Sequence, residues 1–185
     1  MKFSRLFLLV FCAFSLMSTS CKKESPTEIE LEYPIIFPDL MEIDVRSVDS
    51  FVIRESNDFP TALDGELAKH NTNKSKIKSA KLTFMRLQVM DYAFADSTKY
   101  SDFGYISELM MDIKKDGLGQ ALIAKKTIPN MRTKAVNLDL ENIELKDYLQ
   151  QENFRMVFKY KKRKAMPNDM PYVITLKFKI IADPI

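Results

Sequence analysis

The chain has 185 residues, of which 46% are hydrophobic and 29% are charged, and its formal net charge at pH 7 is +3. These proportions predict one globular domain with an appendage, and they exclude a wholly disordered, collagen-like or multi-span membrane protein. The chain has one histidine, two cysteines and no tryptophan. This is too little for a His-rich catalytic metal site, a zinc-finger cage or a disulfide scaffold, so we expect no cofactor.

The first 20 residues follow the pattern of an export signal. Lys2 and Arg5 precede an apolar run over residues 6–17, and small polar residues occupy positions 18–20. The run is shorter than the roughly 20 residues that a membrane-spanning helix needs, and small residues after such a run are typical of a cleavage site. We therefore predict a signal peptide over residues 1–20.

The stretch Ser18-Thr19-Ser20-Cys21 resembles the lipobox of bacterial lipoproteins, and Lys22-Lys23-Glu24 resembles the charged tether of lipoproteins from the Bacteroidota. This resemblance implies lipidation of Cys21 and a lipid-anchored protein at the outer membrane, on its periplasmic or its cell-surface face. Two or more acyl chains make release from a membrane negligible. The alternative is ordinary cleavage near Ser20, which leaves a soluble periplasmic protein with a free thiol.

The charge balance of the processed chain is close to neutral. Cleavage after residue 20 removes Lys2 and Arg5, so 26 of the 28 basic residues remain against 25 acidic ones. Nucleic-acid binding needs a strongly basic face. We therefore expect no nucleic-acid partner.

Residues 21–38 are rich in charge and proline and are predicted to form a lipidated tether. Glu28, Glu30 and Glu32 alternate with apolar residues, so a short strand is the alternative, although three prolines disfavour a long one. The acidic alternation itself is interpreted as a solvated face rather than a calcium site.

Residues 39–185 are predicted to form an all-β domain, because apolar residues recur at every second position over short windows bounded by turn residues. The windows 156–160 and 172–180 show this most clearly, and we expect them to pair as antiparallel neighbours. Six further strands are expected over 41–45, 50–53, 78–91, 108–114, 121–125 and 135–140. About eight such strands predict an antiparallel two-sheet sandwich, for which an immunoglobulin-like topology is expected.

Local signals refine this prediction. The apolar phase changes near Met85-Arg86, which predicts a bulge or a strand that changes sheets. Asp116-Gly117, followed by Gly119, predicts a hairpin between the 108–114 and 121–125 strands. One to three short helices are expected, over 61–70, over 144–150 and as a single turn at 103–106 that begins after Ser101-Asp102.

Residues 77–181 resemble a largely uncharacterised β-sandwich lipoprotein type of the Bacteroidota. The stretches that carry this resemblance are Ile77–Leu82, Lys115–Leu118 through Ile123-Ala124, Val136–Leu140 with Leu145–Leu149, and Thr175–Lys179. The resemblance implies a fold and a location, and it transfers no catalytic residue.

The run Lys159–Lys164 is the strongest local charge feature. Lys161, Lys162, Arg163 and Lys164 are candidate contacts for an anionic partner, and a guanidinium is well suited to bidentate phosphate binding. The alternative interpretation places Lys159 and Lys161 on the solvent face of a strand, with the other residues at its end, where positive charge prevents edge-to-edge aggregation.

Catalytic signatures are scarce. His70 lies in a polar stretch and is interpreted as a surface residue, and the phosphate-binding glycine loop and the nucleophile and zinc motifs are missing. Asp139 and Glu141 share one face of a predicted strand and are the carboxylate pair considered for hydrolysis.

We therefore expect no enzyme but a lipid-anchored cell-envelope protein with a binding or structural role, as an accessory subunit of an envelope or surface assembly. An adhesin-like or glycan-capture module and a small carboxylate-dependent hydrolase are the alternatives. The expected partners are the membrane, through the acyl anchor, and an envelope protein or a glycan.

Overall fold

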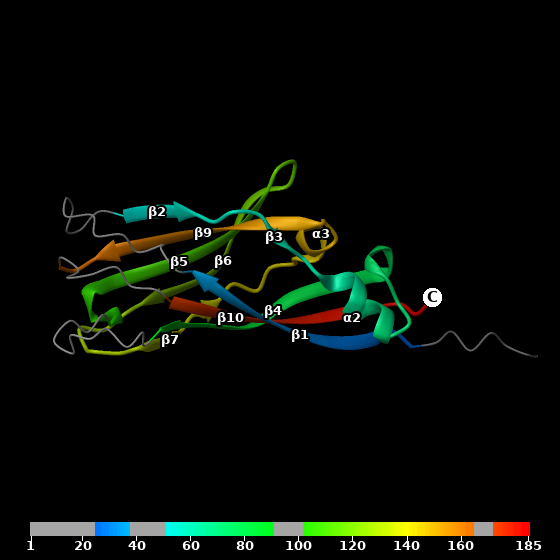
Figure 1. Cartoon of the computed structure of the whole chain (residues 1–185), viewed down its shortest axis with the longest axis horizontal. Coiled ribbons are helices and arrows are strands. Elements are labelled where there is room, and N and C mark those ends of the chain that lie inside the picture. The colour runs from blue at the N-terminus through cyan, green and yellow to red at the C-terminus, as the bar shows by residue number, and fades with distance from the viewer. Residues whose placement is uncertain (1–24, 38–50, 91–101, 165–171) are drawn as a thin grey trace, which may run out of the picture.

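The computed structural model describes residues 25–37, 51–90, 102–164 and 172–185. Within them the chain forms two antiparallel β-sheets packed face to face (Figure 1), which confirms the predicted all-β sandwich. Sheet A contains, in spatial order, β1 (Thr27–Phe37), β10 (Tyr172–Ala182), β4 (Ile77–Val89) and β7 (Ala135–Asn137). Sheet B contains β2 (Phe51–Glu55), β9 (Asn153–Lys162), β5 (Ile106–Lys115), β6 (Gly119–Thr127) and β8 (Asp139–Leu140), and the two-residue β3 (Phe59–Pro60) also pairs with β9.

The strand order corrects the expected topology. In an immunoglobulin domain the first two strands are neighbours in one sheet, whereas here β1 and β2 belong to different sheets and β1 pairs with β10. Among the eight longer strands, every connection except the β5–β6 hairpin passes from one sheet to the other. The orders β1-β10-β4-β7 and β2-β9-β5-β6 are those of a jelly roll, which has eight strands in two Greek keys.

The expected pairing of the last two strands is also wrong. β9 lies between β2 and β5 in sheet B, and β10 lies between β1 and β4 in sheet A. The two strands face each other across the core instead, where the ring centroids of Phe158 and Tyr172 are 5.3 Å apart. A connection of nine residues, 163–171, is long enough to join two sheets about 10 Å apart. Its length therefore does not require the two strands to be neighbours in one sheet.

Residues Thr27–Phe37 form a strand of 11 residues, so this part of the predicted tether belongs to the sandwich, and the strand is longer than the short one given as the alternative. β1 pairs with β10 along its whole length, from Thr27 opposite Ala182 to Phe37 opposite Tyr172. Ile29, Leu31 and Ile35 are buried, and the alternating glutamates are exposed. Pro34 lacks a backbone N–H and is tolerated because β1 is an edge strand, which forms backbone hydrogen bonds to a neighbouring strand on one side only.

Most other predicted strands are present, with changed bounds. The β5–β6 hairpin is confirmed, and both Gly117 (φ 85°) and Gly119 (φ 84°) adopt the left-handed conformation that glycine reaches without strain. The predicted 135–140 strand is divided between β7 in sheet A and β8 in sheet B. The strand predicted over 41–45 lies outside the described residues.

The helices are short, as predicted. They are α2 (Leu63–Lys69), the single turns η1 (Lys74–Lys76) and η2 (Phe103–Tyr105), and α3 (Lys146–Leu149). The predicted cap of the turn at 103 is confirmed, because the Asp102 carboxylate accepts a 2.7 Å hydrogen bond from the Gly104 N–H. In the described part of the chain, no helix is long and apolar enough to cross a membrane.

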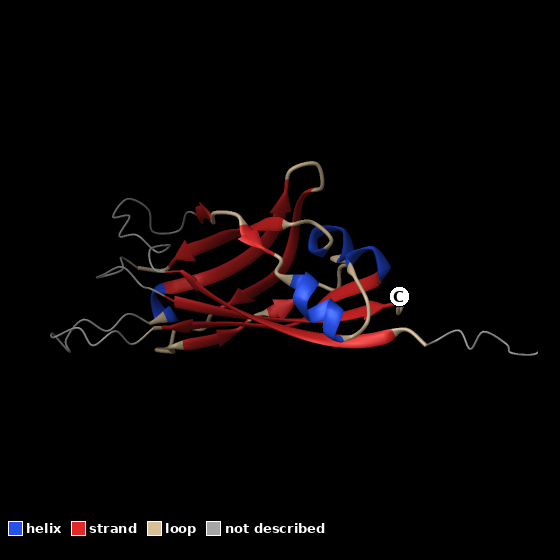
Figure 2. Cartoon of the chain, turned by 45° about the vertical axis from the view of Figure 1, so that its right-hand side comes forward, coloured by secondary structure: helices blue, strands red, loops and turns tan. Residues whose placement is uncertain are grey.

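The two ends of the sandwich differ. The start of β1, the C-terminus, α2 and α3 lie at one end (Figures 1 and 2). The Ile185 N–H donates to the Asn71 carbonyl there, at 2.9 Å, and the Thr72 hydroxyl donates to the Asp183 carbonyl at 2.5 Å. The connections that leave β1, β4, β6 and β9 start from the opposite end.

Glu144 joins α3 to sheet A. Its Oε1 accepts hydrogen bonds from the backbone N–H groups of Ala80 (2.6 Å) and Lys146 (3.0 Å), and its Oε2 accepts one from the Ser79 hydroxyl (2.7 Å). Partial burial raises the pKa of this carboxyl, but the hydrogen bonds together outweigh it, so the net pKa is lowered. The ionised form is therefore stabilised by folding.

We predict that Glu144→Gln lowers the free energy of unfolding by about 1 kcal/mol at pH 7, a value reduced for the exposure of the group. Because the pKa is lowered on folding, this contribution is present above the unfolded pKa of about 4.3 and is lost as the pH falls through the folded pKa. Urea unfolding at pH 7 and pH 3 measures both effects. Glu30→Gln, an exposed glutamate of β1, is the control, and an equal loss in both variants contradicts the prediction.

Candidate binding site on the outer face of sheet A

A β-bulge in β4 shapes the outer face of sheet A. Opposite β10, Lys177 pairs with Phe84 but the next residue, Phe178, pairs with Leu82, so Thr83 is the extra residue. Leu82 and Met85 are both buried, whereas Thr83 and Phe84 between them face outward. Without the bulge, strict alternation would direct Phe84 into the core. The bulge is confirmed two residues before the predicted position, and the strand stays in one sheet.

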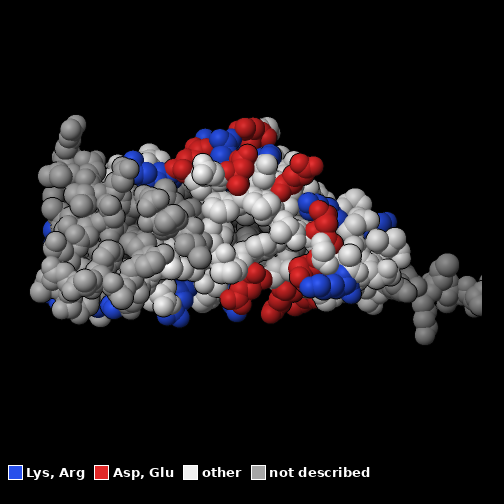
Figure 3. Space-filling model, in the orientation of Figure 1, with Lys and Arg blue, Asp and Glu red and all other residues white. Residues whose placement is uncertain are grey.

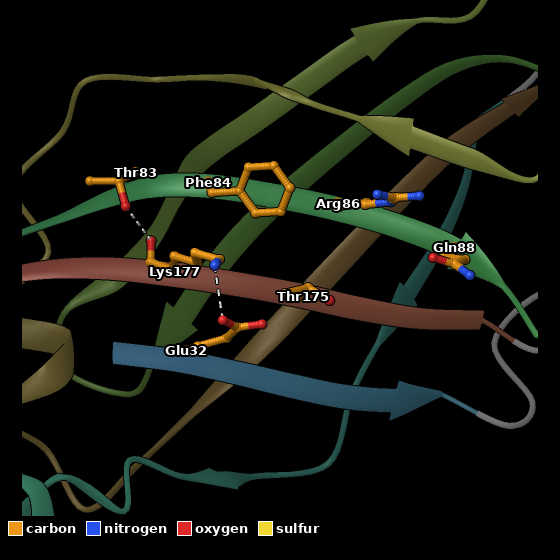
Figure 4. A pocket seen from close by; sticks show the side chains of 7 residues that line it. All are labelled: Glu32, Thr83, Phe84, Arg86, Gln88, Thr175 and Lys177. Carbon is orange, nitrogen blue, oxygen red and sulfur yellow. Dashed lines mark hydrogen bonds and ion pairs between the residues drawn. The ribbon is translucent and has the colours of Figure 1, made fainter. Parts of the chain in front are cut away.

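A hollow of about 510 Å³ lies on this face, over the middle of the sheet. Its lining comes from three neighbouring strands: Glu32 of β1, Thr175 and Lys177 of β10, and Thr83, Phe84, Arg86 and Gln88 of β4. The β4 side chains follow one another along the strand (Figure 4). Strand geometry puts alternate residues such as Phe84, Arg86 and Gln88 about 7 Å apart.

The charges in the hollow are unequally neutralised. The Lys177 ammonium lies 2.9 Å from the Glu32 carboxylate and 5.9 Å from the centre of the Phe84 ring. The exposed Arg86 side chain lines the same hollow. Its guanidinium has no ion pair or hydrogen bond among the described residues. The lining therefore has one cation in excess, together with neutral hydroxyl and amide groups.

The outer face of sheet B is different, because its charges are paired with one another. Arg155 contacts Glu55 (2.8 Å), Asp58 (3.6 Å) and Asp116, and Lys114 contacts Glu55 at 2.7 Å. Acidic and basic side chains accordingly lie side by side along the upper edge of the molecule in Figure 3. Such mutual pairing leaves little charge for a ligand.

Asp112 is the most buried acid of this face, with 2% of its surface exposed. Its Oδ2 contacts the Lys159 ammonium and the Gln120 amide, and its Oδ1 has no hydrogen-bond partner among the described residues. Within the part of the chain that the structure describes, no cluster of three His, Cys, Asp or Glu side chains is arranged to hold a metal ion.

The structure separates the members of the basic run. Lys161 lies 3.8 Å from Glu108, Lys162 is buried, and Lys164 is exposed with its ammonium 4.4 Å from the centre of the Tyr105 ring. The Arg163 guanidinium donates to the carbonyls of Gly104 (3.0 Å), Ile128 (2.5 Å) and Pro129 (3.5 Å). The run is therefore not one continuous basic surface, and a contact with an anionic partner stays a prediction.

The other candidate residues are accounted for individually. His70 is exposed at the C-terminal end of α2, as expected. Asp139 and Glu141 each contact a lysine, Lys126 at 2.8 Å and Lys125 at 2.7 Å respectively. The hydrogen bond to Glu141 raises the pKa of Lys125. Cys21 lies outside the described residues.

Sequence reasoning missed Phe84 and Arg86 as site residues. The phase change in β4 is the available signal, but by itself it predicts only a bulge or a strand that changes sheets. Only the register against β10 shows which side chain the bulge turns outward.

Comparisons with known proteins show no family for this chain. No protein-family model matches it, and no curated protein matches it. A solved structure titled Desmodium yellow mottle tymovirus is 9% identical, with 86% of this chain and 90% of that chain covered and a TM-score of 0.31. A second, titled turnip yellow mosaic virus, is 9% identical, with 87% and 96% covered and a TM-score of 0.34. Scores this low support no conclusion about function.

We predict that Arg163→Ala lowers the free energy of unfolding by about 2 kcal/mol, because the partly buried hydrogen bonds to the carbonyls of Gly104 and Ile128 lose their charged donor. Lys164→Ala, the matched control, should change it by less than about 0.5 kcal/mol, since its contact with Tyr105 is exposed. Chemical denaturation of both variants measures the difference. Equal losses of stability in the two variants would show that the Arg163 hydrogen bonds to Gly104, Ile128 and Pro129 do not stabilise the fold.

Proposed function

We propose that this protein is a lipid-anchored protein of the cell envelope that acts by binding, and that the hollow on the outer face of sheet A is its binding surface. The observation that carries the proposal is the combination in this hollow of an outward-turned aromatic ring and a guanidinium with no acidic partner among the described residues. Binding sites commonly combine an apolar surface with a few polar groups that fix orientation.

The position of the N-terminus is compatible with the anchor. β1 begins at Thr27, six residues after Cys21, at the end of the sandwich that carries α2 and the C-terminus. Acyl chains on Cys21 would hold this end near the membrane. The hollow, on the flank of the sandwich, would then remain open to the surrounding space.

Two versions of the proposal remain, an accessory subunit of an envelope assembly and a ligand-capture module. The hollow favours capture, because its lining offers a few convergent polar groups around one ring rather than a broad apolar surface of the kind found at the centre of stable protein interfaces.

We predict that Cys21→Ala abolishes metabolic labelling with palmitate and releases the protein from the membrane fraction, because no other residue near the cleavage site can carry the acyl chains. Cys12→Ala, within the signal peptide, is the control and should keep both properties. Labelling of the Cys21→Ala protein would refute the anchor.

We predict that a photo-crosslinking amino acid at Gln88, on the rim of the hollow, captures an envelope component in living cells. The same amino acid at Thr127, exposed on sheet B, is the control and should capture none. Gel mobility separates the two versions: one adduct of fixed mass indicates a protein subunit, and a polydisperse adduct indicates a polysaccharide. Equal adducts at both positions, or none at Gln88, would contradict binding at this face.

A further inference from the structure

Arg86 differs from the other cations on the outer face of sheet A. The ammonium groups of the neighbouring lysines have oxygen partners: Lys177 with Glu32, Lys179 with Glu28 at 2.7 Å, and Lys81 with Asn142 at 2.9 Å. Within the described residues Arg86 has none. A guanidinium presents a planar fork of N–H donors that matches a carboxylate in a bidentate arrangement. The N–H donors of the Arg86 guanidinium are therefore suited to bind one planar anion, such as a carboxylate.

The side chains around Arg86 indicate which other chemical groups the ligand should carry. On one side along β4 lies the Phe84 ring, which the bulge turns outward, and on the other lies the Gln88 amide. Thr175 stands directly opposite Arg86 on β10. An aromatic face binds apolar C–H surface, whereas amide and hydroxyl groups exchange hydrogen bonds with neutral polar groups.

We propose that the hollow binds an acidic saccharide, that is, a sugar unit that carries a carboxylate. The carboxylate binds Arg86, the C–H face of the sugar ring packs against Phe84, and sugar hydroxyls bond to Gln88 and Thr175. The Glu32–Lys177 pair neutralises its own charge, so the hollow has a net charge of +1, which matches one carboxylate per site. This inference rests on the proposed binding function and names its ligand class.

An anionic lipid headgroup of the anchoring membrane fits the same site less well. Arg86 lies opposite Thr175, and Thr175 lies opposite Pro34 of β1. Pro34 is seven residues beyond the first residue of β1, or about 23 Å along the strand. The site is therefore set back from the end at which the anchor attaches.

Binding of uronic-acid oligosaccharides to purified residues 22–185 tests the proposal. The probes are trisaccharides or tetrasaccharides of galacturonate, alginate and hyaluronan. Their binding is measured by calorimetry. The methyl ester of the galacturonate trimer is the matched uncharged probe. We expect at least one acidic probe to bind, and its esterified or neutral counterpart to bind at least tenfold more weakly. Phosphatidylglycerol vesicles form the lipid arm and should bind no better than neutral vesicles.

Arg86→Gln should weaken binding of the acidic probe at least tenfold, and Phe84→Leu about fivefold. Lys179→Gln removes a cation from the same face outside the hollow and should change binding less than twofold. The proposal is overturned if no acidic probe binds, if ester and acid bind alike, if the vesicles bind through Arg86, or if Lys179→Gln matches Arg86→Gln. Crosslinking at Gln88 with no saccharide binding would overturn this inference and leave the binding function standing.

Discussion

The structure depends on the contact between β9 and β10 across the core. Each strand is flanked by partners on both sides within its own sheet, and apolar side chains point inward from Phe154 to Tyr160 of β9 and from Tyr172 to Ala182 of β10. The Phe158 and Tyr172 rings meet where the two rows face each other. Because the last two strands occupy different sheets, the earlier strands have to pair around them, β1 and β4 beside β10, and β2 and β5 beside β9. This placement is part of the jelly-roll order.

The candidate site is a consequence of how β4 meets this core. Leu82 and Met85 are both buried three positions apart, and regular alternation cannot bury both. The bulge at Thr83 resolves the conflict and turns Phe84 to the outside. The packing of the core thus supplies the aromatic surface of the hollow. Arg86, two residues further along the same strand, then lies beside that ring without an acidic partner among the described residues.

The two outer faces of the sandwich have different electrostatic properties although both carry many charges. On sheet B, carboxylates and cations pair so extensively that Arg155 alone contacts three acids. Exposed pairs of this kind contribute little stability individually, but the carboxylate and the cation of each pair neutralise each other. On sheet A, Glu32 and Glu28 of β1 pair with Lys177 and Lys179 of β10, and Arg86 of β4 has no acidic partner among the described residues. This asymmetry makes the β4 side of sheet A the more suitable surface for an anionic ligand.

The sequence by itself determined the strand content, the buried face of most strands, the β5–β6 hairpin and the cap at Asp102, because these depend on alternation, on glycine and on contacts between near neighbours. It also carried the phase change in β4. Only the tertiary structure decided that β9 and β10 face each other rather than pair, and that Phe84 lies beside Arg86 on an open surface. The physical reason is that alternation has a period of two and is satisfied beside any neighbouring strand. The neighbour, the register and the direction of a bulge are set by contacts between residues that lie far apart in the chain.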